Sequence, residues 1–124
     1  MTDTVVITGI ARTPMGAFKG AFADVAAPDL GAVAIKAAIS EANVAADAVE
    51  QVVMGCVLPA GQGQAPARQA ALGADLPKAA EAVTVNKMCG SGMQAAIMAH
   101  DTIKAGSADI IVAGGMENMT RAPY

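Results

Sequence analysis

Short apolar, β-rich runs alternate with Ala-rich helical stretches along this chain of 124 residues. The β-rich runs cover residues 4–11, 50–58, 83–86 and 109–113. Stretches with helical spacing of their apolar residues lie between them, at 28–43, 66–72 and 91–105. The order β-α-β-α-β-α-β favours crossover connections and a mostly parallel sheet with helices on both faces. We therefore expect a single α/β domain over residues 1–124.

Local signals mark the ends of these elements. Pro28 and Asp29 begin the first helix with a proline in the first turn and an acid near the positive helix end, and Asn43 is a plausible left-handed stop. The apolar run Ile110–Val112 is typical of a strand buried on both faces. No closing element follows Gly115, so we expect a larger fold to continue beyond this chain.

Composition limits the function classes. The apolar fraction is 54 %, yet only one Tyr and two Phe are present, so the core must consist mainly of Ala, Val, Ile, Leu and Met. The formal net charge of −3 provides no basic footprint for nucleic acid or for a membrane surface. No apolar run approaches the roughly 20 residues that span a bilayer. We expect neither a nucleic-acid partner nor a membrane partner.

Two further features suggest the compartment. Residues 1–4 lack the charged region and apolar stretch of a signal peptide, and they lack the Arg-rich character of a transit peptide. Only Cys56 and Cys89 are present, so the sequence does not predict a fold stabilised by disulfides. This favours a reducing environment. We expect a cytoplasmic protein.

The stretch 85–96 (VNKMCGSGMQAA) carries the chemistry. A short strand turns there, and Cys89 falls at or just before the start of a helix, whose positive end favours an ionised sulfur. Gly90 and Gly92 leave space beside that sulfur, and Lys87 adds positive charge if it points the same way. Nearby amides would be available to an oxyanion. On these residues alone, a nucleophile and an inert buried cysteine are both open.

Several segments resemble the thiolase family, in the same order. Residues 86–93 (NKMCGSGM) are similar to its nucleophile motif, and residues 55–72 (GCVLPAGQGQAPARQAAL) resemble its second strand, loop and short helix. Residues 114–124 (GGMENMTRAPY) and 7–22 (ITGIARTPMGAFKGAF) also match. The resemblance covers nearly the whole chain and identifies it as the N-terminal half of a thiolase, with that family's layered fold.

The resemblance implies a catalytic role for Cys89. In thiolases the matching cysteine takes an acyl group from a coenzyme A thioester, and its backbone N–H contacts the oxyanion. A second, deprotonated acyl-CoA then attacks in a Claisen condensation, and the reverse reaction is thiolysis of a 3-ketoacyl-CoA. Asn86, Gly90, Ser91 and Gly92 would support the nucleophile turn. Coenzyme A thioesters are expected as substrates, with no permanently bound cofactor and no metal.

Part of the active site is expected outside this chain. His100 is the only histidine, and eleven residues of one helix separate it from Cys89, roughly 16 Å at about 1.5 Å per residue. That distance is far beyond hydrogen-bond reach, so His100 cannot be the base for Cys89. The resemblance implies that a C-terminal half supplies the catalytic histidine and an acid/base cysteine. Cys56 lacks the Gly-rich loop of that second cysteine and is expected to be a buried strand residue.

Other polar residues are expected to have structural roles. Arg68 and Gln69 would hold the loop or a subunit contact rather than touch substrate. Glu117, after two glycines, would bind loop N–H groups, and Ser91 would cap its helix. The run 61–64 (GQGQ) lacks the Gly-Lys-Ser/Thr ending of a phosphate loop.

The Cys-Gly-Ser-Gly form at 89–92 and the GQGQAPARQ loop resemble the biosynthetic, acetoacetyl-CoA-forming members of the family. The expected substrates are therefore acetyl-CoA and acetoacetyl-CoA. A degradative 3-ketoacyl-CoA thiolase, a non-catalytic truncated domain and a condensing enzyme that uses carrier-protein thioesters are the alternatives. The family also implies a homodimer or homotetramer, in which strand 83–86 pairs across the dimer axis.

Overall fold

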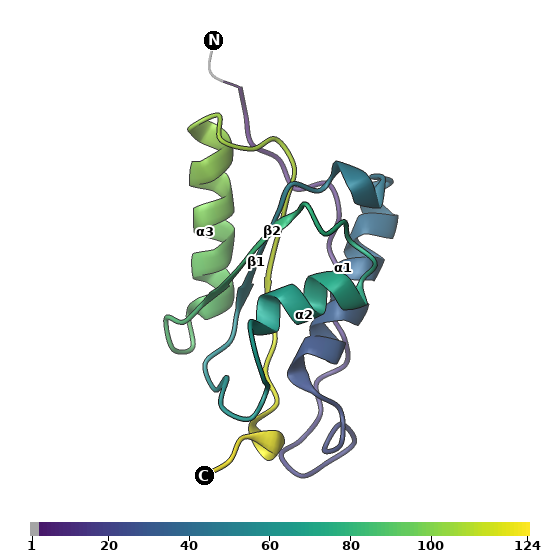
Figure 1. Cartoon of the computed structure of the whole chain (residues 1–124), viewed down its shortest axis with the longest axis vertical. Helices are drawn as coiled ribbons and strands as arrows, with labels where there is room; N and C mark the ends of the chain where they lie inside the picture. The colour runs from purple at the N-terminus through teal and green to yellow at the C-terminus, as the bar shows by residue number, and fades with distance from the viewer. Residues whose placement is uncertain (1–2) are drawn as a thin grey trace.

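The computed structural model describes residues 3–124 and contains a three-stranded parallel sheet with helices on both faces (Figure 1). Met1 and Thr2 lie outside the described residues; they belong to residues 1–4, in which the sequence shows no features of a signal or transit peptide. The helices are α1 (Ala27–Ala42), α2 (Pro66–Gly73) and α3 (Ser91–Lys104). The strands are β1 (Gln51–Gly55), β2 (Glu81–Val85) and β3 (Ile111–Gly115), and two short 3-10 helices span Ala46–Ala48 and Met119–Arg121. The predicted α/β class is confirmed.

The strand order is β2-β1-β3, and both pairings are parallel. The chain moves outward from β1 to β2 and then returns past β1 to β3. Because parallel crossovers are right-handed, this reversal places their helices on opposite faces. Accordingly, α2 packs with α1 on one face and α3 covers the other (Figure 1). The carboxyl ends of all three strands lie at one edge, where α3 begins.

The ends of α1 follow from its sequence. Pro28 lies in its first turn, Asp29 is the acidic residue there, and Asn43 closes the helix in the left-handed conformation with φ 54°. The amide of Asn43 donates to the carbonyl of Ser40, and that of Val44 donates to the carbonyl of Ile39. These contacts satisfy carbonyls that the end of the helix would otherwise leave free. The predicted start and stop of this helix are confirmed.

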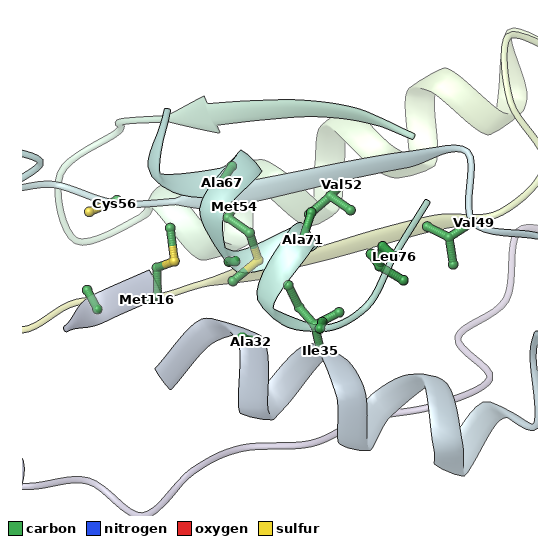
Figure 2. Close-up of a cluster of buried hydrophobic side chains, with 13 residues drawn as sticks. Ala32, Ile35, Val49, Val52, Met54, Cys56, Ala67, Ala71, Leu76 and Met116 are labelled. Atoms are coloured by element: carbon green, nitrogen blue, oxygen red, sulfur yellow. The ribbon is translucent and has the colours of Figure 1, made fainter. Parts of the chain in front are cut away.

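The core is built from small and aliphatic side chains, as the composition predicts. Met54, Val52 and Cys56 are its largest fully buried side chains, and they lie on or next to β1. Figure 2 shows Ile35 of α1 and Ala71 of α2 directed toward this group. Alanines of α1 and α2 fill most of the remaining space, which allows the helices to approach the sheet closely.

The prediction of a strand over 4–11 is wrong. This segment is extended but has no strand ladder, and the sheet contains three strands rather than four. Gly9 packs on α1, since a Cβ there would lie 2.2 Å from the carbonyl oxygen of Ala38. An extended segment becomes a strand only when a neighbouring backbone pairs with it. Residues 4–11 have no such neighbour within the described chain.

Candidate functional site

The site is a sharp turn between β2 and α3. β2 ends at Val85 and α3 begins at Ser91, so five residues connect a strand to a helix of nearly opposite direction. Met88 has φ 48°, a left-handed conformation that non-glycine residues rarely adopt. Cys89 follows Met88, directly precedes the N-cap residue Gly90, and is exposed. The turn therefore presents a thiol to solvent in front of a helix N-terminus.

The side chain of Asn86 forms one hydrogen bond within this turn and another to the loop after β1. Its Oδ1 accepts the amide of Met88 at 2.9 Å, and its Nδ2 donates to the carbonyl of Val57 at 3.1 Å. The first bond favours the unusual conformation at Met88, because it satisfies the amide of that residue within the turn. The second bond fixes the position of the turn relative to the carboxyl end of β1.

Ser91 holds the turn from the helix side. Its Oγ accepts the amide of Lys87 at 2.8 Å and donates to the carbonyl of Met88 at 2.5 Å. The side chain is 5 % exposed, so water does not compete freely for these bonds. The expectation that Ser91 caps its helix is wrong: Gly90 occupies the N-cap, and no side chain caps it. The hydroxyl instead binds backbone groups that precede the helix.

Glycines allow α3 to lie directly on the carboxyl ends of two strands. A Cβ on Gly55, the last residue of β1, would be 2.6 Å from the carbonyl carbon of Ser91. Gly92 faces Gly115 at the end of β3, and a Cβ on Gly115 would be 3.4 Å from the Cα of Gly92. Hence the backbone of the first turn of α3 packs on the backbone of β1 and β3. This contact sets the height of Cys89 above the sheet.

The surroundings of Cys89 are electropositive at the backbone level. The first amides of a helix lack intrahelical acceptors and form the positive end of its dipole. Within residues 3–124, no acceptor lies in hydrogen-bond geometry with the amide of Cys89 itself. Lys87 does not point at the sulfur, because its Nζ donates to Oε1 of Gln94, one turn into α3, at 3.1 Å. The backbone therefore supplies the local positive field.

A second polar group lies beside the turn, at the ends of β1 and β3. The carboxylate of Glu117 accepts the amides of Val57 at 2.8 Å and Leu58 at 3.0 Å. This arrangement matches the expected structural role of Glu117. Cys56 lies against the same carboxylate and against Gln62, and only 1 % of its surface is exposed. Burial raises the pKa of the Cys56 thiol; Gln62 partly offsets this, and the negative charge of Glu117 raises it further.

Arg68 and Gln69, at the start of α2, also contact backbone. Arg68 donates to the carbonyl of Ala80 at 2.6 Å, just before β2. The Nε2 of Gln69 donates to the carbonyls of Gln62 and Gln64, at 2.8 and 2.7 Å. Gln69 thus holds the loop that leads into α2, as predicted, whereas Arg68 holds the loop that leads from α2 to β2.

His100 lies far along α3 from the turn. Its Nδ1 is 2.9 Å from the neighbouring Asp101, and both side chains are exposed. The structure therefore places the only histidine of the sequence at the opposite end of the helix from Cys89. Within the described part of the chain, no three His, Cys, Asp or Glu side chains form a group that could hold a metal.

Comparison with known proteins assigns the family. Residues 5–124 match the model of the thiolase N-terminal domain. The chain belongs to the thiolase family. Its fold is also similar to the crystal structure of the Acat5 thiolase from Ascaris suum in complex with coenzyme A. The TM-score is 0.93, with 40 % identity over 94 % of this chain and 31 % of that one.

Relatives that are named acetyl-CoA acetyltransferases match almost the whole length of this chain. It is 53 % identical over all 124 residues to an acetyl-CoA acetyltransferase of Cupriavidus necator and covers 31 % of that protein. It is 49 % identical over 122 residues to a mitochondrial acetyl-CoA acetyltransferase of Danio rerio and covers 29 % of it. This thiolase domain therefore spans about a third of the length of these relatives. None of the helices in residues 3–124 has the length and apolar character that crossing a membrane requires.

Two features of this thiolase site escaped the sequence reasoning. The first is the bond from Asn86 to the loop after β1, which joins residues 29 positions apart and leaves no periodic signal. The second is the contact of Gly55 with Ser91. Here a signal was present, because a glycine that ends an apolar strand often marks close approach of another backbone.

Proposed function

We propose that this chain carries the nucleophile of a coenzyme A-dependent acyltransferase. The Sγ of Cys89 attacks the carbonyl carbon of acetyl-CoA, the thioester bond to coenzyme A breaks, and coenzyme A leaves as its thiol. The carbanion of a second acetyl-CoA then attacks the acetyl-cysteine. A carbon–carbon bond forms, the acyl–sulfur bond breaks, and acetoacetyl-CoA leaves with regeneration of the cysteine. The reverse sequence is thiolysis.

The observation that carries this proposal is the position of Cys89. The sulfur is exposed directly ahead of an α3 N-terminus that no side chain caps. The unpartnered amide of Cys89 supports its assignment as a donor to the oxyanion of the tetrahedral intermediate. Asn86, Gly90, Ser91 and Gly92 are assigned to support of the turn. Their hydrogen bonds and close packing keep the geometry fixed while the acyl group is bound.

The proton chemistry requires residues outside this chain. His100 lies at the wrong end of α3, and the raised pKa of buried Cys56 does not suit it to donate and accept protons near neutral pH. We assign the catalytic histidine and the acid/base cysteine to the remaining two-thirds of the protein. No resident cofactor or metal enters this scheme, and coenzyme A thioesters are the substrates. We place the enzyme in the cytoplasm.

The short-chain, biosynthetic reaction is favoured by the names of the relatives, which are acetyl-CoA acetyltransferases. A degradative thiolase of broader chain length is the second candidate, because the resemblance does not fix the acyl pocket. Rates with acetoacetyl-CoA and with 3-ketoacyl-CoAs of longer chain separate the two. A strong preference for acetoacetyl-CoA supports the biosynthetic assignment.

We also propose that the enzyme is a homodimer or homotetramer that pairs through β2. This strand bonds only to β1, so its other edge is free within the described residues. Val83 on β2 is 45 % exposed, Met88 in the turn that follows is 66 % exposed, and Met93 in the first turn of α3 is 70 % exposed. A free apolar edge favours pairing with a second copy. Light scattering measures the molar mass of the wild type and of Val83→Lys in solution. The wild type should be oligomeric and Val83→Lys should have a lower mass; a monomeric wild type would contradict the proposal.

The decisive experiment uses a hybrid protein that joins residues 1–124 to the part of the Cupriavidus necator enzyme beyond the matched region. After incubation with acetyl-CoA, intact mass should show one acetyl group, and peptide mapping should place it on Cys89. Cys89→Ala should abolish the adduct, and Cys56→Ala should retain it. A folded hybrid without an adduct, under conditions that acetylate the Cupriavidus necator enzyme, would favour a non-catalytic domain.

A further inference from the structure

The side chains of Glu117 and Asn86 both bind the backbone of Val57. The amide of Val57 donates to Oε1 of Glu117 at 2.8 Å, and its carbonyl accepts Nδ2 of Asn86 at 3.1 Å. The other end of the Asn86 side chain accepts the amide of Met88 at 2.9 Å. A continuous path of hydrogen bonds therefore leads from Glu117 to the residue that precedes Cys89.

The sheet fixes the start of this path, because backbone pairing continues past the strand ends. The amide of Met116, just after β3, donates to the carbonyl of Gly55 at 2.9 Å. The amide of Cys56, just after β1, donates to the carbonyl of Val85 at 3.0 Å. Glu117 thus lies one residue beyond a bonded position of the sheet, which holds its backbone in place.

The carboxylate of Glu117 suits this position because it offers two acceptors. Its Oε2 accepts the amide of Leu58 at 3.0 Å, and the thiol of Cys56 lies 3.7 Å from the same oxygen. Consecutive backbone amides directed at one group are a common way for proteins to bind an anion. Bonds to a charged acceptor are also roughly twice as strong as bonds between neutral groups. One side chain thus holds three consecutive residues of the loop, 56–58.

The path meets the proposed chemistry at the peptide between Met88 and Cys89. This peptide is trans and planar, so the amide of Cys89 points opposite to the carbonyl of Met88. That carbonyl accepts both the hydroxyl and the amide of Ser91, which fixes its direction. The bond from the Met88 amide to Asn86 restrains the other side of Met88. The direction of the oxyanion donor therefore depends on Ser91 and on Asn86.

We propose that Glu117 is a positioning residue for acyl transfer. Through Val57 and Asn86, its carboxylate keeps the amide of Cys89 directed at the oxyanion of the tetrahedral intermediate. This role rests on the proposed acyltransferase function, and it goes beyond the contribution of Glu117 to the stability of the loop. Loss of the carboxylate should therefore slow a reaction that forms an oxyanion more than another reaction of the same sulfur.

Two reactions of Cys89 in the hybrid protein make this comparison. Acylation by acetyl-CoA forms an oxyanion, whereas alkylation by iodoacetamide displaces iodide from a saturated carbon and forms none. In Glu117→Gln, the acylation rate should fall about 10–100-fold, less than the loss of about 100–1,000-fold that follows deletion of an oxyanion donor. The alkylation rate should change less than about 3-fold, since no oxyanion donor takes part. Glu81→Gln, which also replaces a carboxylate but at an exposed position, should leave both rates unchanged.

A double-mutant cycle tests whether the effect passes through Asn86. Asn86→Ala should itself lower the ratio of acylation rate to alkylation rate, and Glu117→Gln should then lower it further by less than about 2-fold. Glu117→Asp keeps the charge but is one methylene group shorter. It should lower the ratio in the same way as Glu117→Gln, and it replaces that variant in the cycle if Glu117→Gln does not fold.

Two results would overturn the proposal. One is an equal change of acylation and alkylation in Glu117→Gln, which would leave Glu117 with a role in stability alone. The other is a cycle in which the effects of the two substitutions simply add.

A folded wild-type hybrid that is not acetylated would contradict the proposed function instead. Hydrogen exchange, which needs no substrate, then tests the path itself. The amide of Met88 should exchange at least about 10-fold faster in Glu117→Gln than in Glu81→Gln. Equal exchange in the two variants would show that Glu117 does not act on the nucleophile turn.

Discussion

Gly55 and Ser91 lie in backbone contact, so closely that a Cβ on Gly55 would stand 2.6 Å from the carbonyl carbon of Ser91. We expect Gly55→Ala to push the start of α3 away from β1 and to destabilise the protein by about 1–3 kcal/mol, the usual cost of overpacking. The acylation rate of Cys89 should fall as well. Urea unfolding and mass spectrometry of the hybrid measure the two effects.

Gly92 provides the matched control for this substitution. A Cβ there would meet its nearest atoms, in Gly115, at 3.7 Å, an ordinary contact distance. Because alanine has the higher helix propensity, by about 1 kcal/mol, Gly92→Ala should leave stability unchanged or improved. Equal destabilisation by both substitutions would show that the close contact at Gly55 is not what limits the packing.

Ser91→Ala should loosen the nucleophile turn. The substitution removes the hydroxyl that accepts from Lys87 and donates to Met88, at a cost of about 1 kcal/mol in the free energy of unfolding. Alkylation of Cys89 by iodoacetamide should change in rate, because the turn that presents the sulfur is no longer fixed. Exposed Ser107→Ala should alter neither quantity. An unchanged alkylation rate in Ser91→Ala would remove Ser91 from the residues that position the nucleophile.

Glu117→Gln should destabilise the loop after β1. The carboxylate accepts two amides, and bonds to a charged acceptor contribute about 1.5–3 kcal/mol, whereas an amide side chain offers one acceptor and one donor. We expect a loss within that range and faster hydrogen exchange at Val57 and Leu58. Glu81→Gln, at an exposed position, should stay within about 0.5 kcal/mol. Equal effects at both positions would contradict the structural role of Glu117.

The raised pKa of Cys56 predicts a specific loss of stability at alkaline pH. Burial and the charge of Glu117 keep this thiol protonated in the folded protein at pH values where it ionises in the unfolded chain. The unfolded state therefore binds fewer protons, and stability falls as pH rises above about 8.5, the ordinary pKa of a cysteine. Unfolding free energies from pH 7 to 10 should fall more steeply in the wild type than in Cys56→Ala.

The sequence predicted local features well and long-range ones poorly. Pro28 and Asn43 signal the ends of α1 through neighbouring residues, and the structure confirms them. The apolar run at 110–112 correctly predicts a strand, but β3 is only half-buried within the described residues, so the expected burial on both faces is wrong. The position of Cys89 just before α3 follows from the same kind of signal. The segment 4–11 was misjudged because β propensity describes a side chain's fit to a sheet and cannot reveal whether a partner backbone is present.

The role of Ser91 was misassigned for a related reason. A serine at the start of a helix predicts capping, but here the helix begins one residue earlier than such capping requires, and Gly90 takes the N-cap. The tight turn at Met88 instead brings the amide of Lys87 and the carbonyl of Met88 within hydrogen-bond distance of the Ser91 hydroxyl. That turn depends on contacts with the loop after β1, which no local window of sequence contains.

The exposed segment 4–11 has a consequence for biosynthesis. Ribosomes release N-terminal residues first, at roughly 5–20 residues per second, so any part of the protein encoded later can cover this segment only after the rest of this domain has emerged. During that delay the nascent polypeptide presents Val6, Ile7 and Ile10 next to an unpaired strand edge. Such surfaces are the ones that chaperones bind and that cause aggregation when they meet. The yield of soluble enzyme should therefore depend on chaperone supply during translation.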